Sequence, residues 1–523
     1  MIAVPTLGLI AGRSWWPKLH AAAPGVGGAN LRDVTTYTLR KGDPATTRTD
    51  VVVVAVGRRG DAFRVAPGGE AVRDAYGRGF PALLRSAGFS GEEGSAASFW
   101  STDKIRAGAL VVVGIGAGDP TDPAVIRRAA GVAARNLGNA GSVALALPAD
   151  DAATVRAVVE GFWSGGSTVR GTDRVPPAHV TVLSSAARRQ DAVAAFETAQ
   201  VVEELADLAR AWTNAPANVL TPEEFVTRTR KLRRKAVSVR VYDREELASL
   251  GCGGILSVGD SSANPPYLVR LRYAPADPVA RIALVGKGVT YDSGGLTIKP
   301  GGSMATMKLD MAGAAAVVAA VHAIAALGLP VEVVGWAPLA ENMPSGTACR
   351  PGDVVRMYDG QTVEIANTDA EGRMLLGDAI GLAREDDPDA IVEISTLTGP
   401  CVTALGHKVA GLFGTPEQVD RVRAAAGSRG ELVWHLPIPD HIARAVRGES
   451  KLADLLQHNW VRWGSASYAA AFLTAFAKDT PFAHLDIAGP AFNTGAAWGD
   501  VPTGGTGFGV RTLVQYVADL AEA

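Results

Sequence analysis

The sequence predicts an α/β fold in two domains, a smaller N-terminal α/β domain and a larger C-terminal α/β domain whose central sheet is mostly parallel. With 523 residues, the chain is longer than one compact core usually requires. Short valine-rich segments of strand length alternate with segments of helical spacing, an order typical of parallel sheets. A long amphipathic segment separates two such series and marks the boundary between the domains.

The N-terminal part divides into an irregular segment and the smaller domain. Residues 1–30 contain three prolines and several glycines, and no regular element is predicted there. Residues 31–187 form the smaller domain, in which apolar runs of strand length surround two stretches of helical spacing. The predicted strands are Asp50–Arg58, Ala109–Gly116, Ser142–Pro148 and His179–Ser184, and the predicted helices are Pro123–Leu137 and Ala152–Phe162.

One glycine-rich turn in this domain has two interpretations. Gly114–Gly118 follows a predicted strand and precedes a predicted helix, as a phosphate-binding loop would. The third glycine of G-x-G-x-x-G, however, falls one place early. A plain strand-to-helix turn is therefore the favoured interpretation.

Residues 188–213 are predicted to form the helix that links the domains, because Arg188–Ala211 has apolar residues on one side and charges on the other. Residues 214–523 form the larger domain. Its first helix is predicted to start at Thr221, with Pro222 at the first helical position and Glu224 completing a capping box. The further predicted strands are Tyr267–Tyr273, Arg281–Val285, Val331–Trp336 and Ala390–Ser395, and the further predicted helices are Ala312–Leu327 and Met374–Arg384.

Charge and composition argue against several classes of partner. Lys and Arg number 51 and Asp and Glu 53, so no basic excess indicates binding to nucleic acid or to an anionic membrane. No uninterrupted apolar run reaches the roughly 18 residues of a spanning helix. The three cysteines include no Cys-x-x-Cys pair, and the N-terminus makes a poor signal peptide. A reducing, cytoplasmic location is expected.

Charged residues gather in three glycine-rich segments of the larger domain. VGKGVTYDSGGLTIKP and MKLDMAG contribute Lys287, Asp292, Lys299 and Asp310, and NTDAEGR contributes Asp369, Glu371 and Arg373. The first of these segments begins where a predicted strand ends, and Asp310 comes just before a predicted helix. We expect them to meet in the crevice at the carboxyl ends of the strands, where open α/β sheets hold ligands.

Four carboxylates in one crevice would repel one another, so the cluster requires added positive charge. Two divalent ions would balance the four charges, and hard oxygen ligands suit Mn or Mg and also accept Zn. Two such ions could share a bridging water and lower its pKa for hydrolysis. The alternative is that each Asp is a helix cap or loop residue and each Lys a surface residue, and the spacing alone does not exclude it.

These three segments resemble the leucyl (cytosol) aminopeptidases, the M17 family of two-metal peptidases. Further stretches of the larger domain are similar as well, among them NAPANVLTP, STLTGP and AHLDIAG. The resemblance covers the chain from about Ala195 to the C-terminus. It implies that the larger domain is catalytic, that the smaller domain is a variable, macro-like α/β domain, and that the protein is a cytoplasmic metal-dependent aminopeptidase.

The resemblance also implies roles for the charged residues. One metal ion, Mn or Zn, would be held by Asp292, Asp369 and Glu371. A second, tighter ion would be held by Lys287, Asp292, Asp310 and Glu371, with Lys287 as a neutral amine. A water bridging the two ions would attack the peptide bond.

The two remaining cations are implied to be catalytic. Lys299 would polarise the scissile carbonyl, and Arg373 would hold a bicarbonate that acts as general base. The substrates would be peptides with a Leu-like N-terminal residue, and the assembly a homohexamer. The residues implied to bind the substrate are Met307, Asn367, Ala370, Thr396, Leu397 and Gly399.

Two alternatives from other classes remain. A nucleotide hydrolase using Gly286-Lys287-Gly288 would need glycine where Arg281 stands and Ser or Thr where Gly288 stands, so the motif fails. A non-catalytic binding protein that retained the aminopeptidase fold would be expected to have lost a ligand or a catalytic cation. All seven charged positions are present.

Overall fold

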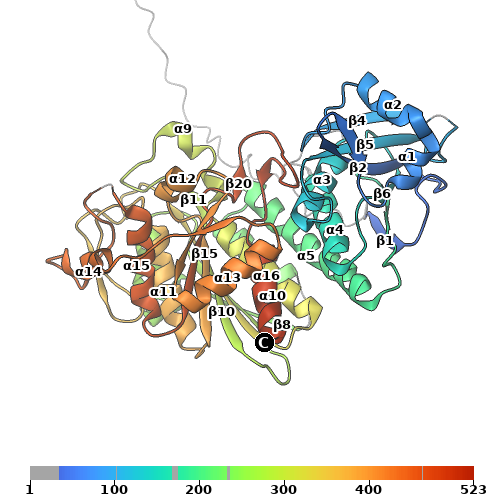
Figure 1. The fold of residues 1–523 in the computed structure, drawn as a ribbon. Helices are drawn as coiled ribbons and strands as arrows, with labels where there is room; N and C mark the ends of the chain where they lie inside the picture. The colour runs from blue at the N-terminus through green and yellow to red at the C-terminus, as the bar shows by residue number, and fades with distance from the viewer. Residues whose placement is uncertain (1–34, 102, 168–174, 233–235, 462, 523) are drawn as a thin grey trace, which may run out of the picture.

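The computed structural model describes two α/β domains that lie side by side (Figure 1). It describes residues 35–101, 103–167, 175–232, 236–461 and 463–522. Residues 1–30, for which the sequence predicts irregular structure, lie outside the described residues.

The N-terminal domain contains a mostly parallel sheet with strand order β1-β7-β6-β2-β5-β4, and β3 pairs with β2. Its central strand β2 is buried up to Gly57 because helices and loops cover both faces. The strands are β1 (Thr36–Arg40), β2 (Val51–Arg59), β3 (Ala62–Val65), β4 (Ala96–Trp100), β5 (Ala109–Gly116), β6 (Ser142–Ala146) and β7 (His179–Leu183). The helices are α1 (Glu70–Tyr76), the 3-10 helix η2 (Gly77–Gly79), α2 (Phe80–Ser86), α3 (Pro123–Arg135) and α4 (Ala152–Gly166).

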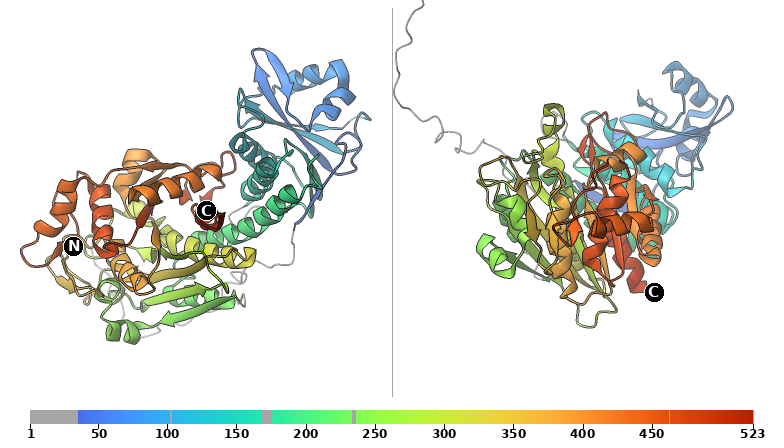
Figure 2. Two further views of the ribbon diagram at one scale, coloured as in Figure 1. Left: turned by 60° about the horizontal axis from the view of Figure 1, so that its bottom comes forward. Right: turned by 90° about the vertical axis from the view of Figure 1, so that its left-hand side faces the viewer.

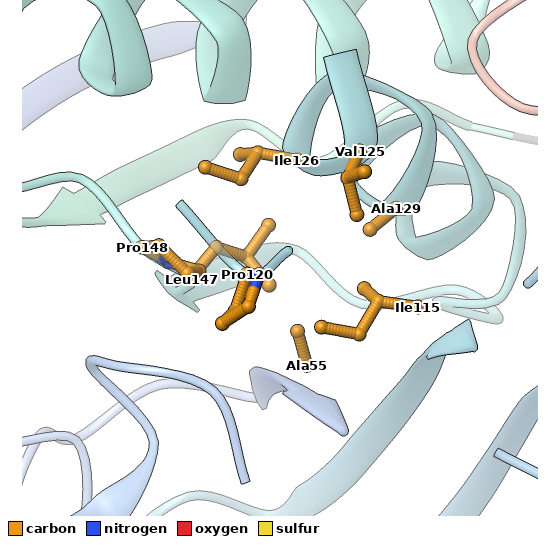
Figure 3. A pocket seen from close by; sticks show the side chains of 8 residues that line it. All are labelled: Ala55, Ile115, Pro120, Val125, Ile126, Ala129, Leu147 and Pro148. Carbon is orange, nitrogen blue, oxygen red and sulfur yellow. The ribbon is translucent and has the colours of Figure 1, made fainter. Parts of the chain in front are cut away.

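A small hollow lies beside the Gly114–Gly118 turn, between β2, β5 and α3 (Figure 3). It has no room for a water molecule. Apolar side chains line it throughout: Ala55, Ile115, Pro120, Val125, Ile126, Ala129, Leu147 and Pro148. The hollow therefore offers no charged or polar side chain to a phosphate, in agreement with a plain turn.

The C-terminal domain contains a larger sheet with strand order β17-β16-β19-β15-β10-β12-β9-β8. Its strands are β8 (Val237–Tyr242), β9 (Tyr267–Tyr273), β10 (Arg281–Gly286), β11 (Gly288–Asp292), β12 (Glu332–Asn342), β15 (Ala390–Ser395), β16 (Ala410–Gly414), β17 (Val433–His435) and β19 (Phe482–Asp486). The short strands outside it are β13 (Val354–Arg356), β14 (Thr362–Glu364), β18 (Leu455–Leu456), β20 (Phe492–Asn493) and β21 (Gly504–Gly505).

Helices cover both faces of this sheet. α5, α10 and α16 pack on one face, and α8, α11 and α15 on the other. The helices are α5 (Gln190–Asn214), α6 (Pro222–Lys231), α7 (Arg244–Leu250), α8 (Gly253–Gly259), α9 (Gly301–Met304), the 3-10 helix η3 (Met307–Leu309), α10 (Ala312–Leu327), α11 (Gly372–Arg384), α12 (Gly399–Leu405), α13 (Pro416–Ser428), α14 (Asp440–Gly448), α15 (Ser465–Ala477) and α16 (Val510–Glu522).

The four central strands β12, β10, β15 and β19 run parallel to one another. Antiparallel strands flank them, with β9 beside β12 and β16 beside β19. The predicted α/β class with mostly parallel sheets is thus confirmed. Because the parallel strands end at the same edge, the loops that follow them converge there, and β11, α9 and α12 lie at that edge in Figure 1.

Several details differ from the sequence-based expectation, including two in the C-terminal domain. Strand β12 runs on to Asn342, six residues beyond the predicted end at Trp336. At the start of α6, the Thr221 side chain accepts a hydrogen bond from the Glu224 backbone N–H, as predicted. The Glu224 carboxylate, however, accepts from Arg228 instead of completing a capping box.

One described helical segment, Met307–Leu327, is long and apolar enough to cross a membrane by length and composition. From the sequence no spanning helix was predicted, because His322 interrupts the apolar run and Gly328 ends it. Of its most apolar window, 89% is buried inside the protein. Within the fold this segment is a core helix between α5, α16 and the sheet.

A buried group of charges joins the two domains, and we call it the interdomain charge cluster. Its members are Arg127 and Glu160 of the N-terminal domain, Glu203 and Arg210 of α5, and Arg429 and Arg511 of the C-terminal domain. Glu160 accepts from Arg127 at 2.9 Å and from Arg429 at 3.1 Å. Glu203 accepts from Arg210 and Arg511. Each carboxylate thus has two arginine partners, and these pairs tie the domains together, with α5 between them in Figure 2.

Candidate metal centre

The charged residues singled out in the sequence meet at the carboxyl ends of the central strands. Lys287 follows β10 directly, and Asp292 is the last residue of β11. Asp310 lies between η3 and α10. Asp369 and Glu371 come from the turn that precedes α11, and Glu371 is its N-cap residue. Five separate chain positions therefore converge because parallel strands bring their following loops to one edge.

Two lysines bridge the four carboxylates in pairs. Lys287 Nζ lies 2.7 Å from Asp310 Oδ2 and 2.7 Å from Glu371 Oε1. Lys299 Nζ lies 2.8 Å from Asp292 Oδ2 and 2.5 Å from Asp369 Oδ1. All but Asp369 and Lys299 are almost fully buried. The two cations thus leave an excess of two negative charges in the cluster when all four carboxyls are ionised.

The turn that carries Asp369 and Glu371 is held by amide side chains. Asn367 Oδ1 accepts from the Asp369 backbone N–H at 2.9 Å. Gln457 accepts from the backbone N–H of Asn367 at 3.0 Å and donates to the Ala370 carbonyl at 3.0 Å. The turn is therefore fixed from both sides.

Two glycines make the close approach of these segments possible. A Cβ on Gly372 would lie 2.5 Å from Lys287 Cε and 2.7 Å from Lys287 Nζ. Gly294 has a φ of +87°, and a Cβ there would lie 2.9 Å from Asp369 Oδ1. Any larger side chain at either position would displace a charged group of the site.

The pKa values reflect the shortage of positive charge. Burial, followed by repulsion from Glu371, raises the pKa of Asp292 to about 6, although both lysines oppose the shift. Burial also raises the pKa of Asp310 well above its usual value. For Glu371, burial acts in the same direction, but Lys287 and Lys299 outweigh it and lower the pKa. The carboxyls are therefore not all stabilised as anions by the protein's own cations.

Arg373 is buried next to the cluster. Its Nη1 donates to the Gln457 carbonyl at 2.8 Å, and its Nε has no hydrogen-bond partner among the residues that the structure describes. Among the described residues, no carboxylate lies within 4.0 Å of its guanidinium. Burial lowers the pKa of Arg373 to about 10, which still leaves it cationic at neutral pH.

The residues expected to bind substrate lie on the segments around this cluster. Thr396 donates to Asp310 Oδ1 at 2.7 Å, and its carbonyl accepts from Lys287. Asn367 and Ala370 belong to the turn before α11, and Leu397 is partly buried against the hydrophobic core that includes α11. Met307 is the first residue of η3, close in sequence to Asp310, and Gly399 is the exposed first residue of α12.

Three further polar residues at the site were not assigned a role from the sequence. Asn342 donates to Asp292 Oδ1 at 2.8 Å, Gln457 holds the Asn367–Arg373 turn, and Asp486 accepts from the loop after β15. Asn342 and Asp486 each end a parallel strand next to a strand that leads into the site. The position at the end of a parallel strand could have identified Asn342 and Asp486 from the sequence. No pattern in the sequence marks Gln457.

The donor set fits divalent metal ions. Asp292, Asp369 and Glu371 each offer a ligand atom, and these atoms lie within 4.8 Å of one another. Asp310 Oδ2, Asp369 Oδ1 and Glu371 Oε1 are buried, and the ammonium groups of Lys287 and Lys299 lie 2.5–2.7 Å from them. Buried hard oxygen donors with excess negative charge are the ligands that Mn²⁺, Mg²⁺ and Zn²⁺ accept.

This fold and donor set define the class as an α/β metallohydrolase with a carboxylate-rich centre. Residues 207–514 match the model of the cytosol aminopeptidase family catalytic domain, and residues 52–167 match that family's N-terminal domain. The chain therefore belongs to the cytosol aminopeptidase family, and it is an aminopeptidase.

Relatives and solved structures agree with this assignment. A probable cytosol aminopeptidase of Streptomyces coelicolor is 42% identical over 94% of this chain and 99% of its own length. One of Micrococcus luteus is 43% identical over 78% of this chain and 84% of its own length. The bottromycin maturation enzyme BotP in complex with Mn is 39% identical, covers 90% of this chain and all of its own, and has a TM-score of 0.79.

Proposed function

We propose that this aminopeptidase uses two divalent metal ions to release Leu-like residues from the N-termini of peptides. The observation that carries the proposal is the charge imbalance of the site, where four carboxylates face only two lysines. Two divalent ions would remove that imbalance, which the two lysines leave in place.

The proposed ligands form two overlapping sets. Asp292, Asp369 and Glu371 would hold one ion, and Lys287, Asp292, Asp310 and Glu371 the tighter second ion. When bound, the pair would act as Lewis acids that polarise the scissile carbonyl and lower the pKa of a shared water. Lys287 can ligate only as a neutral amine, so binding must release the proton that its carboxylate neighbours now favour.

Lys299 and Arg373 carry the remaining roles. The Lys299 side chain is 16% exposed and is the more accessible of the two lysines, which supports the proposal that it would stabilise negative charge on the carbonyl oxygen. Arg373 offers a buried cation with an unused Nε–H. A bicarbonate bound there would accept the proton of the attacking water, because it combines a basic oxygen with oxygens for the guanidinium.

The substrate class and the assembly are proposed from the resemblance of the sequence motifs to the family. Met307, Leu397 and Ala370 are apolar and would favour a Leu-like or Met-like N-terminal side chain, with Asn367, Thr396 and Gly399 completing the lining. Relatives named cytosol aminopeptidases support a cytoplasmic protein. A homohexamer is proposed, and a sedimentation mass near one 54.0 kDa chain would contradict it.

The test is the hydrolysis of leucine amide by the purified chain, with and without added Mn²⁺ or Zn²⁺, beside the Glu371→Gln variant. Mn²⁺ is the first metal to try because BotP was solved in complex with Mn. We expect activity that requires the metal and a near-complete loss in Glu371→Gln, whose amide cannot replace a bridging carboxylate. Activity without metal, or full activity of the variant, would overturn the proposal. A folded, metal-binding but inactive wild type would favour the non-catalytic alternative.

A further inference from the structure

The loop after β15 reaches the metal centre through Thr396. The Thr396 hydroxyl donates to Asp310 Oδ1 at 2.7 Å, and the Thr396 carbonyl accepts from Lys287 Nζ at 3.3 Å. Asp310 and Lys287 are the two residues that belong only to the proposed tighter metal set. The position of this loop therefore affects the positions of the Asp310 and Lys287 side chains.

Asp486 fixes this loop from the neighbouring strand. It ends β19, and Ser395 at the end of β15 is its partner in the parallel ladder. Asp486 Oδ1 accepts from the backbone N–H of Leu397 at 3.2 Å, and Oδ2 accepts from the Thr398 hydroxyl at 2.7 Å. The Ala488 N–H donates to Oδ1 as well, at 3.1 Å. Asp486 thus holds the residues that follow Thr396 while its own backbone is fixed in the sheet.

Hydrogen bonds from this loop and from Ala488 satisfy the Asp486 carboxylate. Its side chain is fully buried, and among the described residues it makes no ion pair. His484, on the same face of β19, is paired with Glu393 instead. A buried carboxylate without a cationic partner is costly unless hydrogen bonds satisfy it, and those bonds come from the loop and from Ala488.

The other metal set depends on different supports. Asp292 Oδ1 accepts from Asn342 Nδ2 and from the Gly294 N–H, each at 2.8 Å. Asp369 is held through Asn367 and Lys299. None of these contacts involves a residue of the loop after β15. A change at Asp486 should therefore affect the tighter metal set more than the set of Asp292, Asp369 and Glu371.

We propose that Asp486 is a positioning residue for the tighter metal ion, acting through the Thr396–Thr398 loop on Lys287 and Asp310. The proposal rests on the two-metal function put forward above. Partners behind metal ligands orient those ligands, and their removal typically lowers metal affinity by roughly 10- to 100-fold. Asp486→Asn should therefore weaken Mn²⁺ binding at the tighter site by about that factor and leave the weaker site close to wild type.

The measurement is a titration of Mn²⁺ into the metal-free full-length chain by isothermal titration calorimetry, below the unfolding temperature of every variant. Glu431→Gln is the matched control. Glu431 is also a buried carboxylate that accepts from two backbone N–H groups, Gly509 and Thr512, and from the Thr512 hydroxyl. It holds the start of α16 rather than a loop of the site, so its loss should lower the melting temperature and leave both Mn²⁺ affinities unchanged.

Thr398 provides a second, milder pair of variants if Asp486→Asn does not fold. Thr398→Val removes the hydroxyl that donates to Asp486 Oδ2, so this variant should bind Mn²⁺ more weakly at the tighter site. Thr398→Ser keeps a hydroxyl at this position and should bind Mn²⁺ as the wild type does. Equal Mn²⁺ affinities in Asp486→Asn and Glu431→Gln, or equal affinities in both Thr398 variants, would overturn the positioning role. In that case a metal-dependent wild type with an inactive Glu371→Gln would leave the two-metal function standing. A wild type that binds no Mn²⁺ would overturn both proposals.

Discussion

Two groups of buried carboxylates in this protein have opposite electrostatics. In the interdomain charge cluster, Glu160 and Glu203 each have two arginine partners. Burial alone would raise the pKa of Glu160, but Arg127 and Arg429 lower it to about 2. At the metal centre, burial and Glu371 raise the pKa of Asp292 to about 6, although Lys299 lies 2.8 Å from Asp292 and Lys287 pairs with the neighbouring Glu371.

The difference shows that burial of a carboxylate does not reveal its role. The number of cationic partners relative to the number of carboxylates does. The interdomain cluster is satisfied by the protein's own cations and holds two domains together. The metal centre is left short of positive charge, which divalent ions would supply under the proposed function. A buried acidic cluster with too few cations is thus the better indicator of a metal site.

The largest loss of stability is expected from removing a carboxylate of the interdomain charge cluster. Glu160→Ala would leave Arg127 and Arg429 buried without their shared partner and should lower the free energy of unfolding by about 3–5 kcal/mol. Denaturant unfolding followed by far-UV circular dichroism measures the change. Because the metal centre does not use this pair, kcat at low temperature should stay near wild type. A loss below about 1 kcal/mol would contradict the structural role.

A slightly smaller effect is expected from removing a cation of the metal centre. Lys299→Ala should lower kcat by about 10²- to 10³-fold, because an oxyanion would lose its fixed positive charge. The free energy of unfolding of the metal-loaded protein should change little. Steady-state kinetics on leucine amide separates kcat from KM, and a change confined to KM would show that Lys299 only binds substrate.

The pH dependence of stability should separate the two regions further. Since the pKa of Glu160 is about 2 in the folded protein and 4.5 ordinarily, its ion pairs stabilise fully above about pH 4.5 and are lost as the pH falls toward 2. The stability difference between wild type and Glu160→Gln should be constant from pH 7 to about 5 and shrink below that. A difference that grows on acidification would show that the assigned direction of the shift is wrong.

The smallest effect is expected for an ion pair exposed to solvent. Glu417 pairs with Arg421 on α13 at 3.0 Å, but the two side chains are 69% and 39% exposed. Glu417→Gln should change the free energy of unfolding by less than about 0.5 kcal/mol, and added salt should reduce even that. An effect as large as that of Glu160→Ala would mean that burial does not set the strength of these pairs.

Local patterns in the sequence were sufficient for most of the regular elements. The valine-rich run at Ala109–Gly116 and the alanine-rich run at Ala312–Leu327 have the predicted bounds, because length and apolar spacing specify them. The charged residues of the site were also found from sequence, since Lys287 follows a strand end and Asp310 precedes a helix. The extension of β12 to Asn342 was missed, because its last residues carry no alternation that separates them from a loop.

The sequence by itself thus determined the α/β class, the parallel strands and the acidic motif around Asp369 and Glu371, because each depends on neighbours along the chain. Only the tertiary structure decided which groups satisfy the buried charges. Glu160 meets Arg429 across 269 positions of sequence, and Asp486 holds a loop 88 positions before it. The packing of strands and domains brings such partners together. The spacing of residues along the chain does not specify that packing.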